Sequence, residues 1–369
     1  MRVVITGGHL TPALAVIDEI VKDHQVIFIG RRTASEGDKS KSAEAIVIPQ
    51  LKIPFFSIEA GRLQRKLTPY TLFALLKIPL GFFQAFLILI KNDPDVVISF
   101  GGYVALPVVL AAWLQRIPVI THEQTTETGL ANKIIARFAQ KVAVAWETSA
   151  ANFPKKKVII TGNPIRAQVL NIKREKVSKP VIYITGGNQG AHVINNAAEE
   201  IVENLASLGE VYHQTGGSEV YHDFERLSEK LATLPKATAE NYHLAKWYST
   251  EELAEILAKA TLVIGRSGAN TITELAYLGI PALLIPIPWV THDEQTKNAQ
   301  ILSSRGAGLI LAQKELTGKR LLSTVEIMLK DITAFQKGAQ EVKKLIKTDS
   351  ASKLAQEALK LAHHGEKTL

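Results

Sequence analysis

The sequence predicts two doubly wound α/β domains, each built on a parallel β-sheet. Apolar runs of strand length alternate with helical patterns through most of the 369 residues, and this alternation stops once and then restarts. The runs are apolar throughout, which is typical of strands buried on both faces, as in a parallel sheet. Between the two series lies a charged segment broken by proline, residues 152–180, which we expect to cross between the domains. We expect a cleft between the domains, with ligands beyond the carboxyl ends of the strands.

The strands can be assigned in order along the chain. In the first series, the run RVVIT at residues 2–6 precedes a helical pattern at residues 12–23, and further strands are predicted at residues 25–30, 95–100 and 117–123. In the second series, strands are predicted at residues 181–185, 210–216, 261–266 and 281–287. This order of strands and helices is that of repeated β-α-β units.

The composition narrows the class of function. The chain has no cysteine, so the sequence excludes disulfides and thiolate chemistry and fits a reducing compartment. Its N-terminus reads as a strand and a turn and lacks the pattern of a secretory signal. Lys and Arg number 43 against 35 Asp and Glu, a balance that favours phosphates, nucleic acid or an anionic membrane as partners. No arginine-rich tail or aromatic-basic array indicates nucleic acid, and we expect none as a partner.

A glycine turn follows the first predicted strand. The strand ends at Thr6, and Gly7 and Gly8 allow the backbone to turn tightly. We expect Thr11 to cap the next helix, with Pro12 at its first position.

Two similar turns occur in the second series. One of them has three glycines between a strand and a helix, Gly186, Gly187 and Gly190. In the other, Gly268 precedes a helix of about ten residues, and Gly279 and Pro281 end that helix. A glycine-lined helix N-terminus offers free N–H groups to an anion, so the three turns together predict phosphate binding, although each turn alone could be a plain connection. None has the full G-x-G-x-x-G pattern, and no Walker lysine follows.

Two acidic features are ambiguous. Glu274, in the helix after the third turn, could accept hydrogen bonds from two ribose hydroxyls, or it could be a favourable charge near a helix start. Asp93 and Asp95 have the spacing of an Asp-x-Asp metal-binding pair, but they fall at the amino end of a buried strand. We interpret that pair as a turn and predict no metal site.

One segment, residues 62–94, is unusually apolar. The first of two adjacent apolar stripes comprises Phe73, Leu76, Leu80, Phe83, Leu87 and Ile90, and the second comprises Leu72, Leu75, Pro79, Phe82, Phe86 and Leu89. Such a helix is buried or meets lipid. A polar line and two helix-weakening residues argue against a membrane span, namely Lys77, Gln84, Lys91, Pro79 and Gly81. The basic residues expected at anionic headgroups are Arg62, Arg65, Lys66 and Lys77.

A set of motifs in a fixed order resembles one family. The motifs are GGYVALP, HEQTTETGLANK, GNPIR, GGNQGAHVIN, HQTG, RSGANTITELAYLGIPALLIP and DEQTKNA. Over nearly the whole chain they are similar to the MurG family, the UDP-N-acetylglucosamine:lipid I N-acetylglucosaminyltransferases of bacterial cell-wall synthesis. The resemblance implies the GT-B fold and inverting transfer of GlcNAc from UDP-GlcNAc to undecaprenyl-pyrophosphoryl-MurNAc-pentapeptide, lipid I, which gives lipid II. It implies a peripheral protein at the cytoplasmic face of the cell membrane, bound through an apolar patch.

The resemblance also implies a domain plan. An N-terminal acceptor and membrane-facing domain is expected at residues 1–160, and a UDP-GlcNAc-binding domain at residues 161–345. The C-terminal helix, residues 346–369, is expected to pack back toward the N-terminal domain.

Residue roles follow from the matching motif positions. Glu274 is implied to hold the ribose and Gln295 to read the GlcNAc hydroxyls, while His9 corresponds to a loop histidine proposed as general base. Further positions implied to contact UDP-GlcNAc are Thr6, Gly7, Gly8, Thr125, Arg166, Asn188, Gln189, Ala269, Asn270, Thr271 and Asn298. Those implied to line the acceptor side are Tyr103, His122 and Glu123. No cofactor is implied.

Three departures from the family pattern concern these positions. The first loop reads TGGH where the family usually has the longer TGGGTGGH, which affects the placement of His9. Asn188 stands where serine is usual, although asparagine can still donate to a phosphate oxygen. Thr125 stands where many members have asparagine, which affects a contact to donor or acceptor.

The implied chemistry suits these residue types. Histidine has a suitable pKa for taking the proton of the attacking sugar hydroxyl. Helix N-termini and Arg166 can stabilise the charge on departing UDP without a metal. Two other classes stay open: another GT-B enzyme, such as a glycolipid glycosyltransferase or a UDP-GlcNAc 2-epimerase, and a non-catalytic nucleotide-sugar-binding subunit.

Overall fold

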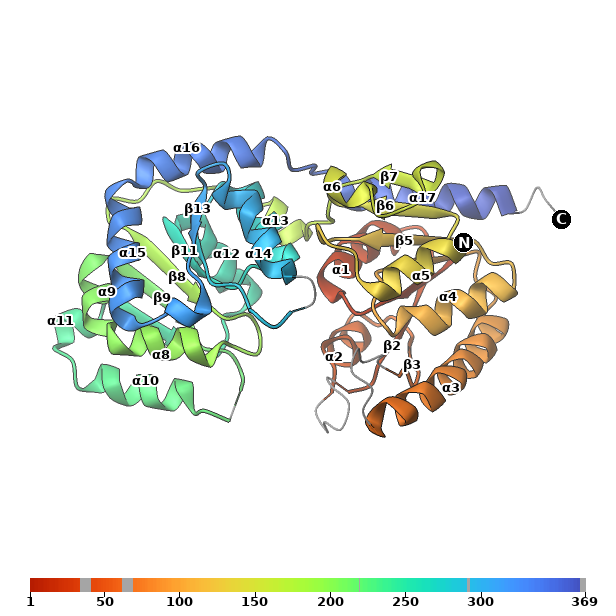
Figure 1. Ribbon diagram of the computed structural model, residues 1–369, viewed down its shortest axis with the longest axis horizontal. Coiled ribbons are helices and arrows are strands. Elements are labelled where there is room, and N and C mark those ends of the chain that lie inside the picture. The colour runs from red at the N-terminus through yellow and green to blue at the C-terminus, as the bar shows by residue number, and fades with distance from the viewer. Residues whose placement is uncertain (34–40, 62–68, 219, 291–292, 366–369) are drawn as a thin grey trace. The chain divides into compact units, whose positions relative to one another are not determined.

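The structure, a computed structural model, describes residues 1–33, 41–61, 69–218, 220–290 and 293–365 (Figure 1). The chain forms two compact units. The first unit comprises residues 1–166 and 347–369, and the second comprises residues 167–346. The first change of unit therefore falls inside the charged segment at residues 152–180. The predicted domain limits, after residues 160 and 345, lie close to these positions.

The first unit contains a seven-stranded sheet in the order β3-β2-β1-β4-β5-β6-β7, whose described pairings are all parallel. The four predicted strands are confirmed as β1 (Arg2–Thr6), β2 (Gln25–Gly30), β4 (Val96–Ser99) and β5 (Val119–Glu123). Three strands were not predicted, β3 (Phe55–Ser57), β6 (Lys141–Val144) and β7 (Val158–Ile160). The last of these lies in the segment that we assigned to the crossing, and it pairs with β6 at the edge of the sheet.

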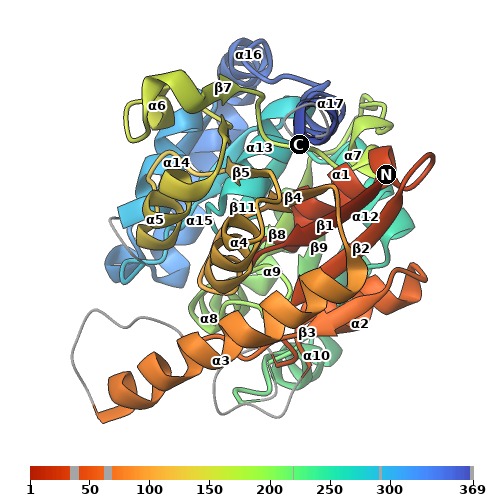
Figure 2. The ribbon, with the colours of Figure 1, turned by 90° about the vertical axis from the view of Figure 1, so that its right-hand side faces the viewer.

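Helices cover both faces of this sheet (Figure 2). One core joins the sheet to α1 (Leu10–Ile20) and α17 (Ser350–Gly365), and the other joins it to α3 (Pro69–Asn92), α4 (Ala105–Leu114) and α5 (Leu130–Phe138). The unit also contains α2 (Ala43–Gln50), α6 (Glu147–Ala150) and the short 3₁₀ helix η1 (Lys155–Lys157). The C-terminal helix α17 contacts α1, β4 and β5, so the end of the chain completes the core of the first unit.

The predicted start of the first helix was wrong. The helix α1 begins at Leu10, with His9 as its N-cap residue, so Thr11 and Pro12 are its second and third residues. Thr11 therefore does not cap the helix, and Pro12 is not at its first position. Proline is tolerated at the third position because the first four N–H groups of a helix have no intrahelical partner.

The second unit contains a six-stranded sheet in the order β10-β9-β8-β11-β12-β13, again with parallel pairings. The predicted strands are confirmed as β8 (Val181–Thr185), β9 (Glu210–Gln214), β11 (Leu262–Gly265) and β12 (Ala282–Leu284). The two edge strands, β10 (Tyr242–Ala245) and β13 (Gly308–Ile310), were not predicted.

The helices of the second unit alternate with its strands. Before β10 come α7 (Ala167–Leu170), α8 (His192–Glu200), α9 (Val202–Leu208), α10 (Asp223–Ala232) and α11 (Lys236–Ala239). After it come α12 (Thr250–Lys259), α13 (Ala269–Leu278), α14 (Glu294–Ser303), η3 (Gln313–Glu315), α15 (Gly318–Lys330) and α16 (Ile332–Lys343). A core of α8, α9 and α15 packs on the sheet. The ten-residue α13, ended by Gly279, confirms the predicted helix.

Candidate functional site

In each sheet the strand order reverses at one place, and loops from both sides meet there. In the first unit the reversal lies between β1 and β4. The loops after these strands are joined by hydrogen bonds from Phe100 N to Thr6 O, 2.7 Å, and from Gly8 N to Gly101 O, 3.0 Å. A side chain at Gly7 would come within 2.8–2.9 Å of Phe100, so glycine is required for this approach. Such a reversal is where open α/β sheets bind ligands.

His9 lies in the turn after β1, at the start of α1. Its side chain is half-buried and does not cap the helix. Burial and, to a smaller extent, the positive charge of Arg31 lower the pKa of His9 to about 4. The imidazole is therefore neutral at pH 7, the form that a general base needs.

Arg31, the first residue after β2, is a candidate site residue that the sequence analysis missed. Its Nε forms an ion pair with Oε1 of the buried Glu44 at 3.1 Å, and its Nη1 donates to the hydroxyl of Tyr103 at 3.1 Å. The arrangement fixes the ring of Tyr103, one of the residues implied for the acceptor side. Its position directly after a strand, at the carboxyl edge of the sheet, is the signal that could have found it.

His122 lies on β5, close enough to His9 for the charge of one ring to affect the other. It is fully buried, and its Nε2 lies 3.0 Å from the carbonyl oxygen of Gly162. Burial lowers its pKa to about 4, with His9 as a smaller cause, and its ring lies 5.8 Å from that of Phe100. The side chain of His122 therefore packs against the loops that contain Phe100 and Gly162 and is not exposed to solvent.

Glu123 and Thr125 form a second buried group at the end of β5. The carboxylate of Glu123 accepts from Thr125 N at 3.1 Å, Thr125 Oγ1 at 2.7 Å and Asn132 Nδ2 at 2.8 Å. Burial raises the pKa of Glu123, and these hydrogen bonds oppose that shift. The Thr125 hydroxyl also contacts the carbonyl of Glu127. The implied ligand contacts of Glu123 and Thr125 stay predictions, since both side chains already bond within the unit.

In the second unit the strand order reverses between β8 and β11, and a glycine turn followed by a helix comes after each of these strands. Neither α8 nor α13 has a side-chain cap among the described residues, whereas Ser42, Ser249 and Thr317 cap α2, α12 and α15. In the part of the chain that the structure describes, no capping side chain therefore competes with an anion for the N-terminal end of either helix.

The turn after β8 accepts hydrogen bonds from the loops that follow β9 and β10. The carbonyl oxygen of Asn188 accepts from Gly217 N at 3.1 Å and from Trp247 Nε1 at 3.0 Å. The residues Asn188 and Gln189 are exposed, and within the described parts of the chain their backbone N–H groups donate to no other group. This leaves both N–H groups available to a phosphate.

The turn after β11 leads directly into α13. Gly268 is the N-cap residue, and the half-buried residues Ala269, Asn270 and Thr271 form the first turn of the helix. Arg266 was not predicted as a site residue. Its Nη1 donates to Ile285 O at 2.9 Å, and burial lowers its pKa to about 10, so it stays a cation at this edge of the sheet.

Glu274 lies beyond the first turn of α13, which contains no acidic residue. This position weakens the alternative of a helix-start charge, because the helix dipole acts mainly within the first turn. The side chain is half-buried and close to Tyr183, whose pKa is raised to about 12 by burial and by the charge of Glu274.

Gln295 and Asn298 lie on α14. Oε1 of Gln295 accepts from Ile287 N at 3.1 Å, so a contact to a sugar would have to come from its Nε2. Asn298 is fully buried and donates to Ser267 O at 3.3 Å, which holds α14 against the loop after β11. Arg166 is half-buried and is the last residue of the first unit before α7.

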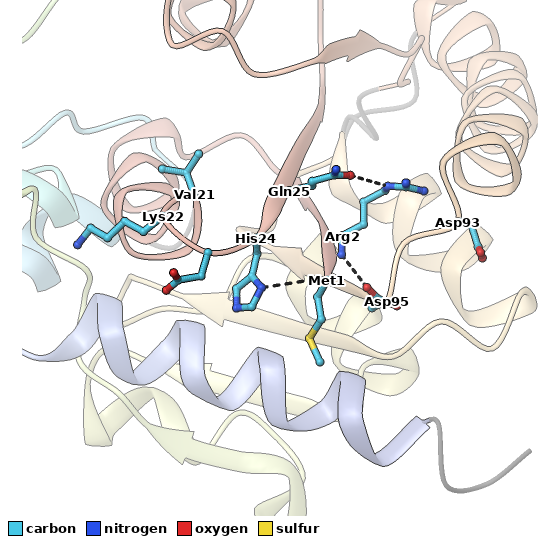
Figure 3. A pocket seen from close by; sticks show the side chains of 9 residues that line it. Met1, Arg2, Val21, Lys22, His24, Gln25, Asp93 and Asp95 are labelled. Atoms are coloured by element: carbon cyan, nitrogen blue, oxygen red, sulfur yellow. Dashed lines mark hydrogen bonds between the residues drawn. The ribbon is translucent and has the colours of Figure 1, made fainter.

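Asp93 and Asp95 lie just before β4, at the amino end of that strand and so at the edge of the first sheet opposite the glycine turn (Figure 3). They line a surface hollow of about 690 Å³ in which Asp95 Oδ2 accepts from Arg2 N at 2.6 Å. The pair forms a turn, as expected. No group of three or more His, Cys, Asp or Glu that could hold a metal occurs among the described residues.

Comparison with known proteins decides the family. Residues 3–144 match the glycosyltransferase family 28 N-terminal domain, and residues 181–357 match its C-terminal domain. UDP-N-acetylglucosamine–N-acetylmuramyl-(pentapeptide) pyrophosphoryl-undecaprenol N-acetylglucosamine transferases are similar over nearly the whole chain. That of Caldanaerobacter subterraneus is 33% identical, over 95% of this chain and 96% of its own, and that of Desulforudis audaxviator is 36% identical, over 90% of each.

The chain belongs to the MurG family. The crystal structure of Acinetobacter baumannii MurG agrees, with a TM-score of 0.72 and 27% identity over 97% of this chain and 99% of that one.

The MurG family membership confirms a two-domain GT-B glycosyltransferase. More distant structures share the fold alone. A UDP-GlcNAc 2-epimerase from Neisseria meningitidis, bound to UDP-GlcNAc, has a TM-score of 0.64 at 15% identity over 98% of this chain and all of that one. The fold by itself therefore does not separate a transferase from an epimerase, and the sequence identity to MurG-family enzymes makes that distinction.

Proposed function

We propose that this protein transfers GlcNAc from UDP-GlcNAc to lipid I, with inversion at C1, and so forms lipid II. The observation that carries the proposal is the identity of 33–36% to transferases named for this reaction, over nine-tenths of the chain or more. The reversal point of the second sheet fits the diphosphate of the donor, because Asn188 and Gln189 offer backbone N–H groups at the carboxyl edge of that sheet.

The second unit is proposed to bind the donor. The backbone N–H groups of Asn188 and Gln189, together with the N-terminal end of α13, would bind the diphosphate. Glu274 would accept from the ribose hydroxyls, and Nε2 of Gln295 would donate to the sugar. As UDP leaves, the positive helix ends, with Arg166, would stabilise the charge that develops on it.

The first unit is proposed to bind the acceptor and to supply the base. His9 would take the proton from the sugar hydroxyl as that oxygen attacks C1 of GlcNAc, and its neutral form makes this transfer possible at pH 7. Tyr103, held by Arg31, would line the acceptor site.

We expect transfer without a divalent metal, since N–H groups and arginines are proposed to carry the charge stabilisation. Activity in excess chelator should equal that in buffer. Loss of all activity to the chelator, restored by Mg²⁺ or Mn²⁺, would contradict this part of the mechanism.

An anionic membrane surface is proposed as a further partner. On α3, Leu80, Phe83, Leu87 and Ile90 are between 49 and 65% exposed, and Trp113 and Leu114 at the end of the adjacent α4 are also exposed. Exposed basic residues on α3, just after α4 and on α5 are Lys91, Arg116, Lys133 and Arg137. An exposed apolar patch rimmed by positive charge suits a lipid surface with anionic headgroups.

The two apolar stripes of α3 have different environments. Phe82 and Phe86 of the second stripe pack against the core, and Leu89 is 1% exposed, whereas the described members of the first stripe face outward. The residues Arg62, Arg65 and Lys66 lie outside the described residues. Among the helices that the structure describes, none has the length and apolar character needed to cross a bilayer. Peripheral binding at the cytoplasmic face of the membrane is the proposed location.

Replacing Leu80, Phe83 and Leu87 together by serine should weaken binding to anionic vesicles by about ten-fold or more, because each residue buries apolar area in the lipid. Vesicle sedimentation measures the effect, and higher salt should also weaken binding by the wild type. A control with Ile327→Ser and Leu345→Ser, exposed apolar residues of the second unit, should bind like the wild type. Equal binding by the triple variant would show that α3 does not meet the lipid.

A further inference from the structure

The HQTG motif, residues 213–216, has no role in the function described so far. It begins at the end of β9 and continues into the following loop. Because β9 pairs with β8 in parallel, this loop lies beside the glycine turn at residues 186–190 (Figure 1). All four residues of the motif contact that turn or the helix α8 that follows it, as shown below.

Two residues of the motif touch the turn itself. Nε2 of Gln214 lies 3.5 Å from Gly187 O, at the outer limit of a hydrogen bond. Gly216 and Gly190 have φ angles of +83° and +80° and pack against each other so closely that a Cβ on either would overlap the other loop. The shape of the glycine turn therefore depends on where the loop after β9 lies.

The position of that loop is fixed by a buried hydrogen-bond network centred on Asn195 of α8. Asn195 Nδ2 donates to Thr215 O at 3.0 Å and to Asp223 Oδ2 at 2.8 Å, which uses both of its hydrogens. Its Oδ1 must then accept from His213 Nε2, at 3.0 Å. His213 Nδ1 in turn accepts from the hydroxyl of Tyr242 at 2.7 Å. Each donor in this network has an acceptor.

The network ends at the first residue of α8. The other carboxylate oxygen of Asp223 lies 2.7 Å from His192 Nδ1, and His192 stacks on Tyr221 with ring centroids 3.9 Å apart. Arg226 adds an ion pair to Asp223 at 3.5 Å. Hydrogen bonds therefore connect the N-terminal part of α8 to residues of β9, β10 and α10.

We propose that Asn195, together with His213, Asp223 and Tyr242, holds the glycine turn in the shape that binds the diphosphate of the donor. These are positioning residues: they act through Thr215 and Gly216 on the turn and do not contact the nucleotide. The inference rests on the proposed function, because it takes the turn at Asn188 as the diphosphate site. A network that holds the turn affects phosphate binding specifically, while one that only stabilises the unit affects every ligand equally.

The test compares two ligands, UDP and uridine, which lacks the phosphates. In Asn195→Leu the side chain keeps its approximate size and loses its hydrogen bonds. We expect the affinity for UDP to fall by about ten-fold or more and that for uridine to stay within about two-fold of the wild type. The matched control is Asn204→Leu, the same change at an exposed residue of α9, which should alter neither affinity by more than about two-fold.

A milder variant covers the case in which Asn195→Leu does not fold. Tyr242→Phe removes only the hydroxyl that donates to His213, and Tyr212→Phe, which removes a hydroxyl bonded to Glu210, is its control. Tyr242→Phe should weaken UDP by about three-fold and leave uridine unchanged.

Two results would overturn the inference in distinguishable ways. Equal losses of UDP and uridine affinity, or unchanged UDP affinity with a lowered melting temperature, would make the network purely structural and leave the proposed function intact. A wild-type protein that binds UDP no better than uridine would reject the diphosphate site itself, and with it both proposals.

Discussion

Replacing His9 by alanine should lower kcat by about a hundred-fold or more, the effect of losing a general base. The affinity for UDP should stay close to that of the wild type, because the role assigned to His9 is to take the acceptor's proton and not to bind the nucleotide. Steady-state kinetics and a UDP titration of the same preparation measure the two quantities. His24→Ala is the matched control, because His24 lies beyond the opposite end of α1.

The pH dependence adds an independent check on His9. A base must be unprotonated, so kcat/KM falls as the pH drops through the pKa of the free enzyme's base. With the pKa of His9 lowered to about 4, kcat/KM should be nearly constant between about pH 6 and 8. Near-normal turnover of His9→Ala would remove His9 from this role, and the shortened first loop would then be the reason.

Replacing Glu274 by alanine should weaken UDP and UDP-GlcNAc alike, by about 1.5–3 kcal/mol, the range for hydrogen bonds to a charged group. The ribose is present in both ligands, so the loss should not depend on the sugar. Calorimetric titration of both ligands measures it, with Glu326→Ala, an exposed glutamate on α15, as control. If UDP binds Glu274→Ala as tightly as the wild type, the glutamate does not hold the ribose.

Gln295→Ala separates the sugar contact from the nucleotide contact. UDP affinity should stay near that of the wild type, while UDP-GlcNAc binding and the discrimination against UDP-GalNAc should both decrease. Since Gln295 also accepts from Ile287 N, the melting temperature of the variant shows whether the loop is intact. The effects of the two substitutions on UDP-GlcNAc should roughly add, because they lie on different elements and touch different parts of one ligand.

The sequence could predict the central strands of each sheet, but it missed the four edge strands and β6, which lies next to the edge strand β7. Central strands such as β1 and β8 are continuous apolar runs, because helices or loops bury both faces. Edge strands such as β3 and β13 are three residues long, and a run so short has no period that separates it from a loop. The strand β7 follows three lysines in a segment whose charge and prolines suggested a crossing.

Parts of the candidate sites could be predicted from the sequence where glycines determine the backbone conformation of a turn. Glycines between a strand and a helix indicate a tight turn, and a turn lies between strand and helix at all three places. The burial of His122 was not predictable, because it depends on how the loops around Gly162 and Phe100 pack above the strand. Arg31 was missed for the same reason, since its partners Glu44 and Tyr103 come from distant parts of the chain.

The most direct test of the central claim is one transfer assay. Purified protein is incubated with labelled UDP-GlcNAc and a lipid I analogue, with UDP-GalNAc and UDP-glucose as competitors. We predict transfer of label to the lipid-linked acceptor, a product with inverted configuration at C1, and weak competition by the other two nucleotides. Conversion of UDP-GlcNAc to its 2-epimer without acceptor, or binding of UDP-GlcNAc without turnover, would contradict the account.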